Sequence, residues 1–113
     1  MNKPLFRLTT SLCILVSTLL LLACTIKFGK EFDPQAFQTW IKREESTLTQ
    51  VREHLGAPQS TGIVVEADGS EYKRWIYYYG KGKLTNMKDA KLKILEIRFN
   101  KQQKVASYNW SAE

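Results

Sequence analysis

The stretch YKRWIYYY, residues 72–79, decides the fold of this chain of 113 residues. Aromatic residues favour strands, and a glycine at position 80 bounds the stretch. Because the side chains of a strand point alternately to its two faces, one face carries Trp75, Tyr77 and Tyr79. The opposite face carries Tyr72, Arg74, Ile76 and Tyr78. We therefore predict a main strand whose two faces differ in chemistry.

Two neighbouring segments extend the predicted sheet. Asp68-Gly69 is a hairpin turn signal, and it joins the main strand to a short strand over Gly62–Glu66. The segment Leu95–Phe99 alternates apolar and charged residues, which indicates a half-buried strand. These segments predict antiparallel pairing around the main strand.

The remainder of the C-terminal half is predicted to contain one loop and one further strand. The segment Lys81–Ala90 reads as a long basic loop, because Gly82, Asn86 and Asp89 interrupt the alternation. After a polar turn, the last strand is expected over Val105–Trp110.

Two short helices are predicted before the sheet. Asp33 can cap the first helix, and Pro34 suits its first position. The second helix has the capping-box spacing at Thr47 and Gln50, and it ends at Gly56. The apolar residues recur at helical spacing in both: Phe37, Trp40 and Ile41, then Leu48, Val51 and Leu55. Two helices followed by an antiparallel sheet predict an α+β domain over residues 33–113.

The first 23 residues are typical of a secretory signal peptide. Lys3 and Arg7 provide a basic head, and residues 8–22 form an uncharged, mostly apolar run. This run is too short for the roughly 20 residues that a transmembrane helix needs. Ala23 supplies a small residue before Cys24. We therefore expect residues 1–23 to be a signal peptide.

Cys24 has three possible roles: a buried core cysteine, half of a disulfide, or a site for chemistry other than packing. The only other cysteine, Cys13, lies inside the expected signal, so the mature chain could form no internal disulfide. The residues Leu21-Leu22-Ala23-Cys24 resemble the bacterial lipobox, whose cysteine receives a diacylglycerol and an amide-linked acyl chain such as palmitate. We expect Cys24 to be the lipid anchor and residues 24–32 to be a lipidated tether.

Over most of the mature chain, the pattern resembles the SmpA/OmlA (BamE-like) family of outer-membrane lipoproteins. The resemblance rests on the lipobox, the helix stop Leu55-Gly56-Ala57-Pro58, the aromatic strand around Trp75-Ile76-Tyr77, and the two final strands. It implies two helices packed on one face of a small antiparallel sheet. It also implies a periplasm-facing lipoprotein of the outer membrane that contributes to outer-membrane protein assembly and envelope integrity, with subunits of the β-barrel assembly machine as partners. Thr25, rather than an aspartate, follows the cysteine, which by the usual sorting rule favours the outer membrane.

Two surfaces are candidate binding sites. The strand face opposite the expected helices is a candidate protein-binding surface, because exposed aromatics with an arginine are typical of interfaces; it comprises Tyr72, Arg74, Ile76 and Tyr78. The basic segment after the main strand is a candidate contact for anionic lipid, and it comprises Lys81, Lys83, Lys88, Lys91 and Lys93. Coverage of the first surface by another segment, and simple solvation of the second, are the alternatives.

The function classes follow from these surfaces. A membrane-tethered inhibitor of a protein, or an anionic-lipid-binding module with the same fold, are alternatives to the assembly role. Of 17 basic residues, two lie in the signal, which leaves 15 against 11 acidic residues, a balance that does not itself indicate nucleic acid. His54 is the single histidine, and Glu44 and Glu45 are adjacent, so they diverge on a helix. We therefore expect no enzyme activity, metal or cofactor.

Overall fold

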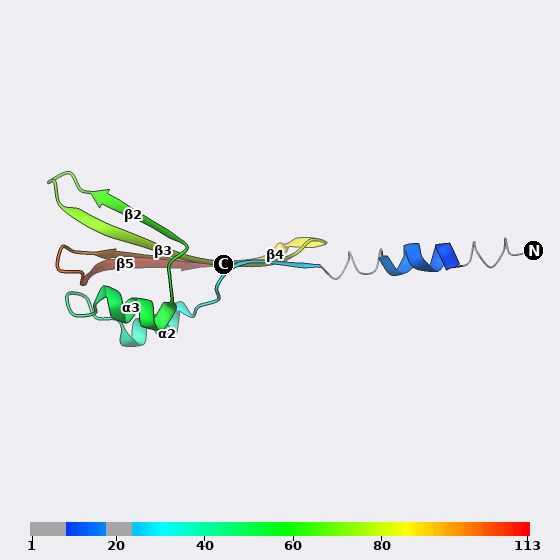
Figure 1. Ribbon diagram of the computed structural model, residues 1–113, viewed down its shortest axis with the longest axis horizontal. Coiled ribbons are helices and arrows are strands. Elements are labelled where there is room, and N and C mark those ends of the chain that lie inside the picture. Colours follow the sequence, from blue (N-terminus) through cyan, green and yellow to red (C-terminus); the bar gives the residue numbers. More distant parts are fainter. Residues whose placement is uncertain (1–8, 18–23) are drawn as a thin grey trace, which may run out of the picture.

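The computed structural model describes residues 9–17 and 24–113, and it has the predicted α+β fold with an antiparallel sheet (Figure 1). Residues 9–17 form an exposed helix. The rest of the expected signal peptide, residues 1–8 and 18–23, lies outside the described residues. Among the helices of the described ranges, none is long and apolar enough to cross a membrane.

Both predicted helices are present and begin at the predicted caps. Helix α2 spans Pro34–Trp40, and the Asp33 carboxylate accepts hydrogen bonds from the backbone of Gln35 and Ala36. Helix α3 spans Leu48–Leu55 and begins with a complete capping box between Thr47 and Gln50. It ends at Gly56, whose φ of 78° lies in the region that glycine tolerates best.

The sheet has five antiparallel strands. They are β1 Thr25–Gly29, β2 Ser60–Val65, β3 Glu71–Lys83, β4 Asn86–Phe99 and β5 Val105–Ala112. The order β1-β3-β4-β5 makes β3 and β4 central. Strand β2 shares the outer edge of β3 with β1: it pairs with residues 71–76, whereas β1 pairs with residues 79–83.

The predicted hairpin turn between β2 and β3 is present. The backbone N–H of Glu66 donates to the Ser70 carbonyl over 2.9 Å, and that of Gly69 donates to the Glu66 carbonyl. The Asp68 carboxylate accepts a hydrogen bond from the Ser70 backbone, which lowers the pKa of Asp68.

The segment Thr25–Phe32 differs from the predicted tether. Thr25–Gly29 form β1, which pairs in continuous register with β3 from Thr25–Lys83 to Gly29–Tyr79. The backbone hydrogen bonds of this pairing, and the alternation of Ile26 and Phe28 with Thr25 and Lys27, account for the strand. Phe32, at the end of the segment, is buried in the core.

The segment Lys81–Ala90 is a second difference, because it is not a long loop. Strand β3 continues to Lys83 and β4 starts at Asn86, so only Leu84 and Thr85 connect them. The pairing Lys81–Lys91 continues the ladder past the glycines, and a register shift between Lys81 and Lys83 accommodates the turn. Together with β1, residues 80–83 of β3 and 86–92 of β4 form a three-stranded extension, the projecting ribbon, which reaches beyond the two helices in Figure 1.

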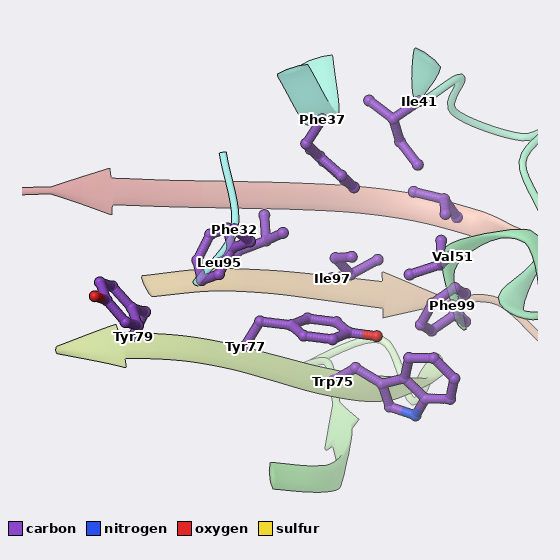
Figure 2. Close-up of a cluster of buried hydrophobic side chains, with 11 residues drawn as sticks. Phe32, Phe37, Ile41, Val51, Trp75, Tyr77, Tyr79, Leu95, Ile97 and Phe99 are labelled. Atoms are coloured by element: carbon purple, nitrogen blue, oxygen red, sulfur yellow. The ribbon is translucent and has the colours of Figure 1, made fainter. Parts of the chain in front are cut away.

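Buried side chains of the two helices and of the sheet form one hydrophobic core (Figure 2). Phe37 and Val51 come from the helices, and Leu95, Ile97 and Phe99 come from β4; all five are nearly or fully inaccessible to solvent. The predicted face of β3 completes this core with Trp75, Tyr77 and Tyr79.

Tyr77 ties the sheet to the helix end. Its hydroxyl donates to the Gly56 carbonyl over 2.8 Å. Burial raises the pKa of Tyr77 to about 12. The helix stop and the aromatic strand, which are far apart in the sequence, therefore meet in one hydrogen bond.

Candidate functional site

The face of the sheet that points away from the helices is here called the open face. The alternation predicted for β3 places all four candidate partner-binding residues on this face, and the structure shows each of them half-buried: Tyr72, Arg74, Ile76 and Tyr78. On β4 the register sets Ile94 beside Tyr78, Glu96 beside Ile76 and Arg98 beside Arg74. The open face thus has an apolar part and a charged part.

The apolar part includes residues that the sequence did not indicate. Phe28 of β1 packs against Tyr78 with ring centroids 6.0 Å apart, and about half of its surface remains exposed. Ile26 precedes it on the same face, and Leu92 and Ile94 flank it from β4. All four are partly accessible to solvent. These residues form the apolar patch: Ile26, Phe28, Tyr78, Leu92 and Ile94.

Gly80 makes room for this patch. A Cβ atom at position 80 would overlap the Phe28 ring, so the ring occupies the space above the glycine. Such close approach requires a residue without a side chain. The sequence predicts that Gly80 ends the main strand. In the structure Gly80 lies inside β3, and the Phe28 ring packs over it.

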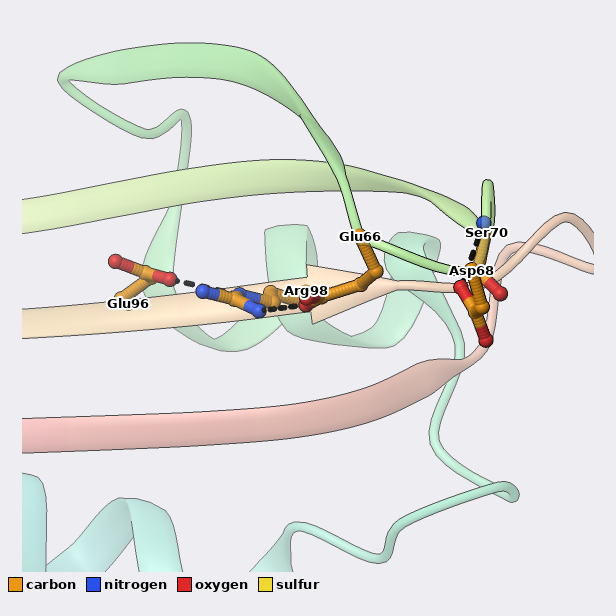
Figure 3. Close-up of polar contacts among 5 residues, drawn as sticks. All are labelled: Glu66, Asp68, Ser70, Glu96 and Arg98. Atoms are coloured by element: carbon orange, nitrogen blue, oxygen red, sulfur yellow. Dashed lines mark hydrogen bonds and ion pairs between the residues drawn. The ribbon is translucent and has the colours of Figure 1, made fainter.

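The charged part is an ionic cluster centred on Arg98 (Figure 3). Its guanidinium donates to Glu96 over 2.9 Å and to Glu66 over 2.7 Å. The hydrogen bond to Glu96, followed by the charges of Glu96 and Glu66, raises the pKa of Arg98. Because Glu66 comes from the β2–β3 hairpin, the cluster links that hairpin to β4 across the open face.

Arg74 lies beside this cluster without joining it. It is directly opposite Arg98 in the register, and its guanidinium is close to Gly62 of β2. Within the described part of the chain, the Arg74 Nε is buried without a hydrogen-bond partner. Buried donors are normally paired, so this atom is the least satisfied polar group of the open face.

The opposite face of the projecting ribbon is basic. The register places Lys27 beside Lys81 and Lys81 beside Lys91, so three lysines lie side by side across three strands. Like charges directly opposite one another destabilise a sheet. With Lys83, these lysines form the lysine face, and a recess of about 410 Å³ lies within it. The lining of this recess includes Lys81, Lys83 and Lys91 together with Thr25, Asn86 and Asp89.

The structure thus brings together three of the five predicted lipid-binding lysines. Lys93 lies nearer the core: its ammonium donates to the Phe32 carbonyl over 3.2 Å and is 3.7 Å from a Glu31 carboxylate oxygen. Lys88 is exposed on β4 outside the recess lining. Lys27 is not among the predicted lysines, because the sequence of residues 24–32 predicts a tether rather than a strand.

The tip of the β3–β4 hairpin lies next to Cys24. The Leu84 backbone N–H donates to the Cys24 carbonyl over 3.3 Å. Cys24 is exposed, as are the two large apolar side chains of the tip, Leu84 at 53% and Met87 at 57%. The lipidation candidate and this apolar tip therefore share one end of the projecting ribbon.

His54, the single histidine of the chain, stacks on Trp40. The ring centroids are 3.9 Å apart and the rings are nearly parallel, at 13°, and His54 is exposed. Within residues 9–17 and 24–113, no cluster of three histidine, cysteine or acidic residues could hold a metal ion.

The open face and the lysine face are therefore the candidate sites, and both suit binding. Comparison with protein-family models, with curated proteins and with solved structures gives no match to this chain.

Proposed function

We propose that this protein is a bacterial lipoprotein of the outer membrane, anchored through Cys24, that faces the periplasm and binds a protein partner in an envelope assembly complex. This is the role that the resemblance to the SmpA/OmlA family implies, with subunits of the β-barrel assembly machine as expected partners. The observation that supports it best is the open face, which carries a partly exposed apolar patch and, further along β3, the half-buried Arg74.

The apolar patch has the composition of a protein interface. Interfaces are enriched in aromatic residues and arginine at their centres, and contiguous exposed apolar surface on a soluble domain marks a binding site. Phe28 and Tyr78 provide two aromatic rings in contact, and Ile94 extends the apolar surface onto β4. Arg74, which is half-buried on the same face, adds a positive charge that would favour an acidic group on the partner.

The proposed packing of the helices supports the same role. In this packing, helices α2 and α3 would cover the face opposite the patch and leave the open face to a partner, and the core that Phe37 and Val51 share with the strands supports it. This is the arrangement expected for the SmpA/OmlA family.

The first experiment is to purify the lipidated, tagged protein from its native envelope in mild detergent and to identify what is recovered with it. Stoichiometric recovery of barrel-assembly subunits supports the proposal. Recovery of the protein alone, or with an enzyme, contradicts the assembly role and favours the inhibitor alternative in the second case.

Paired variants then test the surface. Tyr78→Ala with Ile94→Ala should release the partner, whereas Ile63→Ala with Val65→Ala should retain it. Ile63 and Val65 are also exposed apolar residues, but they lie on β2, away from the patch. Equal recovery with both pairs would exclude the open face as the binding surface.

The lysine face favours a second candidate function, the binding of anionic lipid. Each basic residue close to anionic headgroups is worth about 1 kcal/mol, and the mutual repulsion of Lys27, Lys81 and Lys91 would be relieved by phosphate. In vesicles that contain the lipidated protein, anionic lipid should protect these lysines from acetylation. Lys101 and Lys104, at the other end of the sheet, are the internal controls. Equal reactivity of all five in anionic and neutral vesicles would reject this function.

A further inference from the structure

In the projecting ribbon, no linker separates Cys24, the proposed anchor, from the first strand of the sheet. Cys24 is followed at once by β1, which pairs with β3 along its whole length. The Cys24 carbonyl also accepts a hydrogen bond from the Leu84 backbone. If Cys24 carries acyl chains, as proposed above, the hairpin tip must lie at the surface of the bilayer that holds them.

The tip has the side chains that a bilayer surface would accept. Leu84 and Met87 expose more than half of their surface. A turn that faced only water would not require apolar side chains at these positions. The amphipathic elements that lie in membrane interfaces combine apolar side chains with lysines whose long stems keep the charge near the headgroups. Lys83 and Lys88 flank the two apolar residues in this way and are exposed.

The charge at this end of the molecule also fits a membrane. The projecting ribbon includes five lysines and one acidic residue: Lys27, Lys81, Lys83, Lys88 and Lys91, against Asp89. Basic residues within a Debye length of anionic headgroups are attracted to them. The occupant best supported for the apolar tip is therefore the bilayer itself, because it is continuous with the anchor site.

We propose that the tip of the β3–β4 hairpin is a second membrane contact, in which Leu84 and Met87 enter the lipid beside the acylated Cys24. This inference rests on the proposed anchor. Two contacts, one covalent and one apolar, would hold the domain in a fixed orientation on the membrane, whereas a flexible tether would let it rotate.

The test places an environment-sensitive fluorophore at the tip of the lipidated full chain in vesicles. The acylated Cys24 has no thiol left to label, so Thr85→Cys supplies the only reactive site in the mature protein. We expect a blue-shifted emission that spin-labelled lipid quenches. The same fluorophore at Gln102→Cys, in the exposed turn before β5, should report water and resist quenching.

Paired aspartates then show whether the two apolar side chains cause the insertion. With Leu84→Asp and Met87→Asp, quenching at position 85 should fall to the level at position 102. With Ile63→Asp and Val65→Asp, which change two equally exposed apolar residues on β2, quenching should stay unchanged. Quenching that survives the change at the tip would mean that proximity to the anchor alone explains it, and would overturn the inference.

The outcomes separate the two proposals. Mass spectrometry of the N-terminal peptide reports acylation independently of the fluorophore. An acylated chain whose residue 85 is as solvated as residue 102 overturns the membrane contact and leaves the anchor intact. A chain without acyl groups overturns the anchor and, with it, the membrane contact at the tip.

Discussion

The two ends of the sheet are built in different ways. At the end that carries residues 71–79 of β3, buried side chains of helices α2 and α3 and of the strands form one packed core. Beyond Tyr79 the same strands continue into the projecting ribbon, where side chains on both faces are exposed. The ribbon therefore depends on backbone pairing and a few surface contacts, whereas the helix-covered end depends on burial.

This difference shows that one pair of strands can serve two purposes. The covered end provides stability, because burial of apolar surface is the main favourable term in folding. The ribbon adds little burial and instead displays lysines on one face and apolar residues on the other. We expect substitutions at the two ends to differ in the size, and even in the sign, of their effects on stability.

The largest effect is expected in the core. Phe99→Ala should lower the free energy of unfolding by about 3–5 kcal/mol, because Phe99 is fully buried against Trp75 and its loss leaves a cavity. Denaturant unfolding of the chain measures the change. Ile26→Ala in the ribbon should cost less than about 1 kcal/mol, since Ile26 is exposed. Similar costs at both positions would contradict the distinction between the two ends.

Gly80→Ala should have the next largest effect, at the boundary between the two ends. The new methyl group would overlap the Phe28 ring, and overpacking of this kind costs about 1–3 kcal/mol. We expect β1 to detach, so its amides should exchange with solvent faster while those of β4 near Leu95 stay protected. Restoration of slow exchange by Phe28→Ala in the same chain would identify the overlap as the cause.

Tyr77→Phe tests the covered end through its link to helix α3. Removal of the hydrogen bond to Gly56 should cost about 0.5–1.5 kcal/mol at neutral pH. Because burial raises the pKa of Tyr77 from 10 to about 12, the contribution is fully present below pH 10 and is lost as the pH rises towards 12. The difference in stability between the two proteins should therefore change over this pH range. A difference that is constant with pH would show that the hydroxyl is not protected by burial.

The smallest effect is expected in the ribbon, and it has the opposite sign. Lys91→Glu should raise the free energy of unfolding by about 0.2–1 kcal/mol, because it replaces a like-charge pair with Lys81 by an opposite pair. The gain should shrink at high salt. Lys101→Glu, in the exposed turn before β5, is the matched control and should change stability less. A loss of stability on Lys91→Glu would mean that the lysine face is not under mutual repulsion.

The elements of the covered end could be predicted from the sequence because their signals are local. Asp33 and Thr47 cap helices within three residues of themselves, and the alternation of Trp75, Tyr77 and Tyr79 is visible in one short stretch. The four candidate residues of the open face followed from the same alternation. These predictions needed no knowledge of which segments pair.

The projecting ribbon could not be predicted, because its strands are formed by residues that are far apart in the sequence. Thr25 pairs with Lys83, and the five residues of β1 form a strand because they pair with residues 79–83 of β3. The short-range pattern predicts that Gly80 ends the main strand and that Gly82 interrupts a loop, whereas both glycines lie within β3 and the Phe28 ring packs over Gly80. Lys27, Phe28 and Ile94 joined the candidate sites only once the register was known, since no short-range pattern places them side by side.

The continuous pairing of β1 also sets the distance between Cys24 and the core of the domain. Five residues of strand, at about 3.3 Å each, carry the chain about 17 Å from Cys24 before it turns into the core. On a lipidated chain the ribbon would act as a rigid spacer that holds the open face at one level above the membrane. A partner would then have to present its own surface at that level, so the length of β1 would help to select which membrane-bound proteins this one can meet.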